Sequence, residues 1–353
     1  MFMSNANSSL DMKISRETLR KISKLKRDNY SCLLIILFNC LIVAVSIYVC
    51  VVVSYIFYPL AVILIGSVHR VFANLLHETS HNTFAENKIL NHIGGTYLSS
   101  YLVFHMAVPY KCSHMKHHSH LGDRQEDPDF EFHISCGLYD NSQPVHWFII
   151  KNILLSMIGY RSIQYIKYIF KDRIFFDMTG QSDKTKREAL RERWAFFVYW
   201  AVLASLIVYF GVITEFILFW LVPMFTAGIT IGWLAELAEH YPLPELEKES
   251  LFLTRNRNGT WLENFIIGRH GDRYHLIHHL APNIPCYKYK AAHQALLNEE
   301  AYRNWNDMCG GIFTWRNDKE ESLISFIIKY RDWQKTNPDS ESFCTYLIQK
   351  QAS

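Results

Sequence analysis

Residues 31–69 read SCLLIILFNCLIVAVSIYVCVVVSYIFYPLAVILIGSVH and contain no Asp, Glu, Lys or Arg. About 20 apolar residues cross the hydrocarbon core of a bilayer as a helix, so this stretch is long enough for two passes. We expect the turn between them at 54–59. A second run, from Trp194 to Ala235, contains a single charge, Glu215. It predicts another helical hairpin, at about 195–214 and 216–235, with Glu215 in the outer turn.

Basic residues lie on one side of both predicted hairpins. Seven Lys or Arg and three acidic residues precede the first run, and nine Lys or Arg lie between Arg161 and Arg193. The two outer turns contain no Lys or Arg. Because positively charged flanks stay in the cytoplasm, we expect a multi-pass integral membrane protein with both termini cytoplasmic.

The overall composition excludes several classes of protein. Half of the 353 residues are apolar, a fraction too high for a disordered chain. The formal net charge of only +3 argues against a nucleic-acid partner. The eight cysteines form no CxxC pair, so we expect neither a disulfide framework nor a zinc ribbon. The anomaly is histidine, with 17 residues against 36 Lys plus Arg.

Nine of these histidines fall at positions suited to metal ligation. They occur in HETSH (77–81), HMKHH (114–118), HLIHH (275–279) and at the end of ELAEH (236–240). Spacings of three and four residues place imidazoles on one face of a helix, where they can share a metal ion. All four groups are expected on the cytoplasmic side. The candidate ligands are His77, His81, His114, His117, His118, His240, His275, His278 and His279.

Nine histidines exceed what a tetrahedral zinc ion uses, and they favour two metal ions with open coordination positions, for which redox iron is the usual reason. A metal transporter or sensor is the alternative of a different class. Its ligands would lie within the spans or in a long histidine-rich loop, whereas these form boxes of fixed spacing outside them. An enzyme is therefore favoured.

The chain resembles the membrane fatty acid desaturase and hydroxylase superfamily, and its bacterial desaturases in particular. The resemblance covers roughly 31–297 and rests on HETSHNTF (77–84), HMKHHSHLGDRQEDPDF (114–130) and YHLIHHLAPNIPCYKYKAAH (274–293). It implies two non-haem iron ions, O2 as co-substrate and a further histidine ligand at the inner end of the fourth span, where His240 stands. Stearoyl-type members carry Asn four residues before that histidine, whereas this chain has Glu236.

Other residues are candidates to orient the ligand histidines by hydrogen-bonding to the ring nitrogen that does not face the metal. Carboxylates near ligand histidines commonly accept the distal ring N–H, a role that the DPD motif gives to Asp127 and Asp129. His120, His270 and Glu236 are further candidates. On a helix Glu236 shares a face with His240 while Glu239 points about 100° away, so we expect Glu239 to matter less.

Glu78 points off the face of His77 and His81, and we expect it to pair with Arg124 or to be solvated. The isolated histidines are expected to be structural or exposed, and they are His69, His92, His105, His133, His146 and His293.

We therefore expect an all-α integral membrane protein with four transmembrane helices in two hairpins and a cytoplasmic helical cap that holds a di-metal site. The apolar segment 88–108 is expected along the membrane interface or under the metal centre. The expected parts are a leader (1–30), a first hairpin (31–76), a cytoplasmic segment (77–193), a second hairpin (194–239) and a C-terminal segment (240–353).

The expected activity is O2-dependent desaturation of an acyl or other lipid chain. The sequence contains no haem-binding HPGG motif, so electrons are expected from a separate ferredoxin, rubredoxin or cytochrome. Hydroxylation remains open, and the DPDF segment is also similar to carotene ketolases, which leaves ketolation and a carotenoid substrate open.

Overall fold

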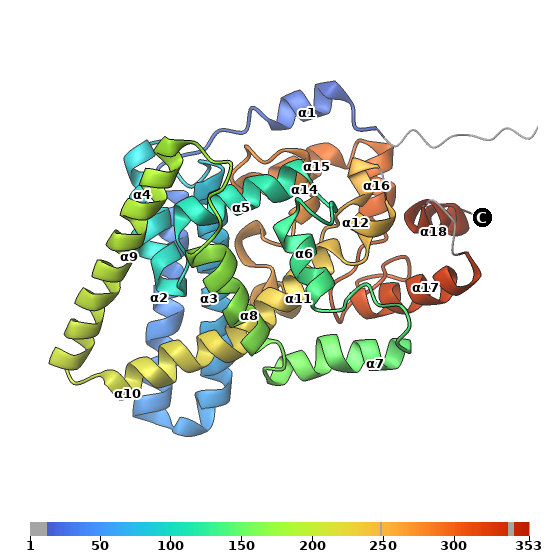
Figure 1. Ribbon diagram of the computed structural model, residues 1–353. Coiled ribbons are helices and arrows are strands. Elements are labelled where there is room, and N and C mark those ends of the chain that lie inside the picture. Colours follow the sequence, from blue (N-terminus) through green and yellow to red (C-terminus); the bar gives the residue numbers. More distant parts are fainter. Residues whose placement is uncertain (1–12, 248, 338–341, 353) are drawn as a thin grey trace, which may run out of the picture.

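Helices form almost all of the regular structure in residues 13–247, 249–337 and 342–352, the part of the chain that the computed structural model describes (Figure 1). The expected all-α class is confirmed for these residues, whose one β-bridge joins Cys309 and Glu321.

The long helices are α2 (Ser31–Tyr48), α3 (Tyr58–Ser80), α5 (Ala107–Ser119), α9 (Asp183–Tyr209), α11 (Ile229–His240) and α17 (Leu323–Thr336). The shorter α-helices are α1 (Arg16–Ile22), α4 (Lys88–Gly95), α6 (Pro128–Ser135), α7 (Val145–Ile149), α8 (Ser162–Tyr168), α10 (Ile213–Phe216), α12 (Leu243–Leu246), α13 (Trp261–Ile267), α14 (His275–Leu280), α15 (Tyr289–Leu296), α16 (Glu300–Asn306) and α18 (Phe343–Ala352).

Short 3-10 and π-helical stretches extend or join these helices. They are η1 (Val49–Val53), η2 (Tyr55–Phe57), η3 (Thr96–Ser100), η4 (Tyr101–Val103), η5 (Ile150–Leu154), η6 (Leu155–Ile158), η7 (Ile169–Ile174), η8 (Ile217–Leu221), η9 (Met224–Gly228), η10 (Ser250–Phe252), η11 (Arg269–Gly271) and η12 (Cys286–Lys288).

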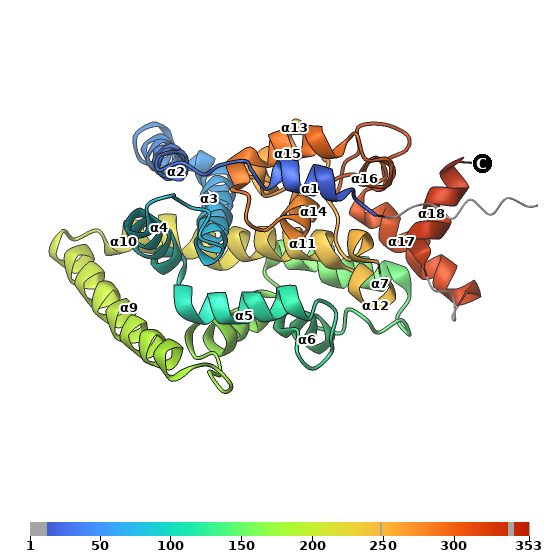
Figure 2. The same cartoon turned by 90° about the horizontal axis from the view of Figure 1, so that it is seen from above.

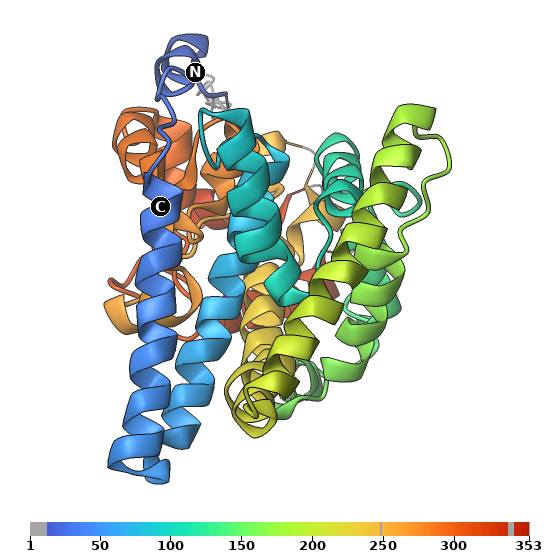
Figure 3. The same ribbon diagram turned by 90° about the vertical axis from the view of Figure 1, so that its left-hand side faces the viewer.

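Four helical segments are long and apolar enough to cross a membrane: Ser31–Val53, Tyr55–Ser80, Asp183–Tyr209 and Ile213–Glu245. The first two form an antiparallel pair (Figure 3). Their turn falls at Ser54, whose hydroxyl accepts the backbone N–H of Ile56. The number of apolar helices agrees with the two predicted hairpins.

The second hairpin turns earlier than the sequence pattern predicted. Its first helix, α9, ends at Tyr209, and Gly211 adopts the left-handed conformation (φ +68°) that commonly follows a helix end. Glu215 therefore lies in the first turn of α10 and not in the connection. Its charge was a misleading marker of the turn, because Gly211 ends the preceding helix.

The segment 88–103 packs between α3 and α9, and its expected place along the membrane interface or under the metal centre stays a prediction. On one side Tyr199 donates to the carbonyl of Tyr97, and Trp200 donates to that of Tyr101. On the other side Gly95 lies so close to α3 that a Cβ there would meet Thr79. Another short apolar helix, Val145–Ile158, exposes the large side chains of Trp147 and Ile158.

The C-terminal helices form a cap beside the C-terminal ends of α3 and α11. Seen from above, α11 runs between α5 on one side and α13, α14 and α15 on the other (Figure 2). The leader contacts this cap at two places. Glu299 accepts hydrogen bonds from the backbone N–H and the hydroxyl of Ser15, and the backbone N–H of Asp28 donates to the hydroxyl oxygen of Tyr287.

The crossing of α3 and η9 depends on a glycine. A Cβ at Gly66 would lie 2.6 Å from Cβ of Ala227 and 2.7 Å from the backbone nitrogen of Gly228. Small residues at such a point let two helix backbones approach closely.

We therefore expect Gly66→Val to destabilise the fold by about 1–3 kcal/mol or more, because the added methyl groups push backbone against backbone. Thermal unfolding of the detergent-purified protein measures the effect. Gly232→Ala is the matched control on the opposite helix, since a Cβ there meets only the hydroxyl of Tyr165, at 3.8 Å. Equal stability of the two variants would contradict the close crossing.

Candidate metal centre

All nine predicted ligand histidines come together near the C-terminal ends of α3, α5 and α11 and on α14. The end of α3 carries His77 and His81, α5 carries the HMKHH group and α14 carries the HLIHH group. The last residue of α11 is His240. Four elements that are distant in sequence thus contribute imidazoles to one place.

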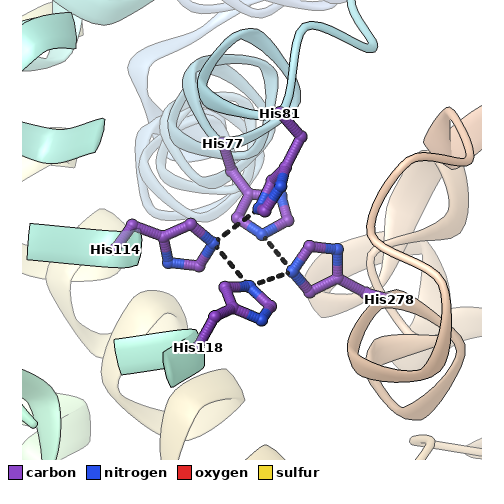
Figure 4. A group of neighbouring side chains, drawn as sticks. All are labelled: His77, His81, His114, His118 and His278. Atoms are coloured by element: carbon purple, nitrogen blue, oxygen red, sulfur yellow. Dashed lines mark hydrogen bonds between the residues drawn. The ribbon is translucent and has the colours of Figure 1, made fainter. Parts of the chain in front are cut away.

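Five of these histidines form a first cluster (Figure 4). The Nε2 atom of His114 lies 2.9 Å from that of His81 and 3.0 Å from that of His118. The Nε2 atom of His278 lies 2.7 Å from that of His118 and 2.9 Å from that of His77. One ring nitrogen from each residue lies within 4.8 Å of all the others, so a single ion could be reached by all five.

The remaining four histidines form a second cluster beside the first. His117, His240 and His279 each offer a ring nitrogen within 4.8 Å of the others. His275 joins them, since its Nε2 atom lies 2.9 Å from that of His240 and 3.1 Å from that of His279. The rings of His118 and His279 have centroids 4.5 Å apart, so the two clusters adjoin.

The donor set fits two metal ions. Two ligands at right angles, each about 2.1 Å from one ion, are separated by about 3.0 Å, which is close to the nitrogen separations in both clusters. Burial, with the charge of neighbouring histidines, lowers the pKa of His118 to about 3 and that of His81 to about 2. These imidazoles are therefore neutral at physiological pH and free to donate lone pairs. Imidazole suits iron, copper and zinc.

Asp127 orients one ligand of the second cluster. Nδ1 of His117 donates to the carboxylate of Asp127 over 2.9 Å, and this carboxylate also accepts the backbone N–H groups of Gly122 and Asp129. Burial alone would lower the pKa of His117, but the charge and hydrogen bond of Asp127 raise it to about 9. Asp129 lies behind, 3.8 Å from the same Nδ1, and pairs with Arg173.

Glu78 and Tyr289 support the first cluster from outside. Glu78 is buried, accepts hydrogen bonds from the hydroxyl of Thr83 and the backbone of Cys286, and lies 3.7 Å from Nδ1 of His77. The expectation that it is solvated or paired with Arg124 was wrong, because the loop before α15 covers it. Tyr289 places its hydroxyl 3.2 Å from Nδ1 of His278.

Four charged side chains, three of them buried and Arg70 half-buried, link the elements that carry the histidines. Glu239 of α11 pairs with Arg257 (2.8 Å) and with Arg70 of α3 (3.3 Å). Both arginines also pair with Asp272, just before α14, at 2.6 and 2.9 Å. Glu239 lies 3.6 Å from Nδ1 of His275 as well. The sequence reasoning missed this network.

The expected ranking of the two glutamates stays a prediction. Glu239 does point away from His240, but its direction leads into the buried network and not into solvent. Glu236 lies 3.3 Å from Nε2 of His133, a histidine that is buried and not exposed. Both glutamates line a cavity beside the second cluster, and an arginine pairs only with Glu239 among the described residues.

The other two candidate orienting residues lie elsewhere. His120 is exposed and contacts the hydroxyl of Ser119. His270 lies 3.1 Å from the amide nitrogen of Asn39, on α2. The structure brings neither ring against a histidine of the two clusters in the part of the chain that it describes.

Comparison with known proteins gives the chain a family. The model of the family described as "Fatty acid desaturase" matches residues 24–309. A dihydrorhizobitoxine desaturase from Bradyrhizobium elkanii is 33% identical over 315 residues, which cover 89% of each chain.

Two plant relatives are more distant. The chloroplastic omega-6 fatty acid desaturase of Brassica napus is 26% identical over 76% of this chain and 62% of its own length. That of Spinacia oleracea is 25% identical over 70% of this chain and 54% of its own. With the family match across most of its length, the chain belongs to the fatty acid desaturase family and is an oxidoreductase.

Proposed function

We propose that this chain is an integral membrane desaturase that uses two iron ions, O2 and electrons from a separate donor protein to form a carbon–carbon double bond. The observation that supports it is the meeting of nine imidazoles, five of them buried and four half-buried, in two adjoining clusters of five and four. Two iron ions held there would supply the oxidation that removes two hydrogens from adjacent carbons while O2 is reduced to water.

The residues of the chain hold, orient and enclose this centre. The carboxylate of Asp127 fixes the ring of His117, and the hydroxyl of Tyr289 does the same for His278. Since burial and Asp127 together leave the metal-free His117 with a pKa of about 9, binding an ion there releases a proton, and ion binding weakens as the pH falls.

The substrate follows from the family and the surroundings of the site. The family implies a lipid or acyl substrate, and two of the four apolar helices end at the histidine clusters. The relative from B. elkanii is named for dihydrorhizobitoxine, and the plant relatives for fatty acids. All of these names describe desaturation, which favours it over hydroxylation or ketolation.

Metal analysis of the purified protein tests the proposed centre. We expect about two iron ions per chain in the wild type and about one in His240→Ala, because the second cluster keeps only three imidazoles. Comparison of extracts from expressing and non-expressing cells should reveal a product lighter by two hydrogens, which His240→Ala does not form.

The control is His146→Ala, which changes an exposed histidine away from the clusters. It should keep the iron content and the product of the wild type. Full iron content and normal product in His240→Ala would exclude His240 as a ligand, and zinc in place of iron would contradict the redox function.

Loss of the Asp127 carboxylate should weaken the second cluster without removing a ligand. We expect Asp127→Asn to lower metal affinity or turnover about 10- to 100-fold, as removal of such an orienting group typically does. Iron titration of the metal-free protein measures the affinity. The neighbouring Glu126→Gln is the matched control, because Glu126 pairs with Lys116 at the surface. Similar losses in both variants would argue against a specific role for Asp127.

The proposed orientation places both termini and the metal centre in the cytoplasm. A reporter fused after the C-terminus and one inserted near Asp183 should both report the cytoplasm, because basic residues flank both hairpins. Single cysteines at Ser54 and Gly211, in a background without reactive thiols, should be labelled only from the opposite side. Labelling of the two turns from different sides would exclude the four-span arrangement.

A further inference from the structure

Two helix faces border a cavity that leads away from the second cluster. On α3, His69, Ala73 and His77 follow one another at intervals of four residues, with Arg70 and Asn74 beside them. On the opposite side, the same interval separates the following residues of η9 and α11: Gly228, Gly232, Glu236 and His240. Residues four apart lie on one helix face, so small side chains face each other where the cavity runs.

Two neighbouring cavities share Arg70, Ala73, His105 and Tyr165 in their walls and are taken together as one cavity in two parts. The part beside the histidine clusters encloses about 90 Å³, and the inner part encloses about 40 Å³ and reaches His69. His69 and His77 are eight residues apart on one helix, which corresponds to about 12 Å at 1.5 Å per residue. The cavity therefore extends over a short distance from the metal centre.

His69 stands at the inner end with its polar atoms unsatisfied. The residue is only 4% exposed, and neither ring nitrogen has a hydrogen-bond partner among the described residues. Its ring makes a T-shaped contact with the ring of Trp220, with centroids 4.6 Å apart. The indole N–H of Trp220 donates to the carbonyl of Leu102 and is therefore not a partner of His69. Buried polar groups are normally paired, so an imidazole in this position calls for a partner within the cavity.

The wall between His69 and the metal centre is polar. Arg70 and Tyr165 line both parts of the cavity, and Glu236 lines the outer part. The buried carboxylate oxygen of Glu236 lies 3.3 Å from Nε2 of His133. A long hydrocarbon chain here would leave both ring nitrogens of His69 without water or partner, which is costly, whereas a polar ligand would hydrogen-bond to the ring.

We propose that this cavity receives one end of the substrate, and that this end is short and carries a hydroxyl, carbonyl or amide group that hydrogen-bonds to His69. A neutral imidazole offers one donor and one acceptor, which matches such a group. His69 is thus a specificity-determining residue that lies in an apolar span. The inference rests on the proposed function, since it takes the histidine clusters as the reacting centre.

Binding of two matched probes to the full-length, iron-loaded protein tests the inference. The probes are 1-octanol and 1,8-octanediol, which differ only in a second hydroxyl, and thermal shift against concentration gives the dissociation constants. We expect the wild type to bind the diol about five- to tenfold more tightly, the gain of one hydrogen bond to a buried group.

Three variants separate hydrogen bonding from shape. His69→Leu should bring the two dissociation constants within about twofold, whereas His69→Gln keeps a donor and an acceptor and should retain the preference. Gly232→Leu should weaken both probes, because its side chain fills the cavity beside Tyr165. His146→Leu, at an exposed site, should behave as the wild type.

Equal binding of the probes to the wild type, tighter binding of 1-octanol, or binding of neither would overturn the proposal. So would a diol preference that persists in His69→Leu. Iron content measured on the same samples separates this failure from failure of the proposed function. Two irons per chain with no preference for the diol would contradict only the proposed polar pocket, whereas absence of iron would contradict the proposed metal centre itself.

Discussion

The crowding of nine imidazoles into one small volume is the constraint on which the rest of this structure depends. Ring nitrogens of neighbouring histidines lie 2.7–3.1 Å apart, a spacing at which protonated rings would repel one another strongly. Burial resolves the conflict by lowering the pKa of most of the cluster histidines outside the apolar spans. The converging lone pairs then have few protons between them, so an ion is the natural common partner.

The orientation of these rings depends on neighbouring side chains that do not belong to the cluster, because the rings come from separate elements. Asp127 and Tyr289 hold individual rings, whereas the network of Arg70, Glu239, Arg257 and Asp272 holds the elements themselves. Buried ion pairs seldom add stability over apolar packing, since desolvation offsets their attraction. Here their contribution is geometric, because each pairing fixes α3, α11 or the start of α14 relative to the others.

The parts of the molecule that the sequence predicted are those encoded locally. Charge-free runs are sufficient to identify apolar helices, and spacings of three and four residues are sufficient to place histidines on one face. The turn of the second hairpin was mispredicted because the prediction rested on the charge of Glu215 alone, whereas the helix ends at Tyr209, shortly before Gly211.

The surroundings of the centre could not be read in this way, because they depend on contacts between distant residues. The direction of Glu239 followed from the helix period, but its partner Arg257 comes from a loop that no local pattern places there. Glu78 likewise owes its burial to the backbone of Cys286, more than 200 residues away. His69 looked like an ordinary histidine in a span until the cavity at its ring was known.

One rigid helix, α3, joins these features and gives the proposed pocket a consequence for selectivity. The helix carries the close crossing at Gly66, the end of the cavity at His69, Arg70 of the charge network and the cluster histidine His77. Because the helix fixes the distance between His69 and His77 at about 12 Å, the substrate carbon that reaches the metal centre is set by the group bound at His69. In this pocket the position of the double bond is counted from the polar end of the substrate. A substrate lengthened beyond the metal centre, on the side away from His69, would therefore keep the same site of desaturation.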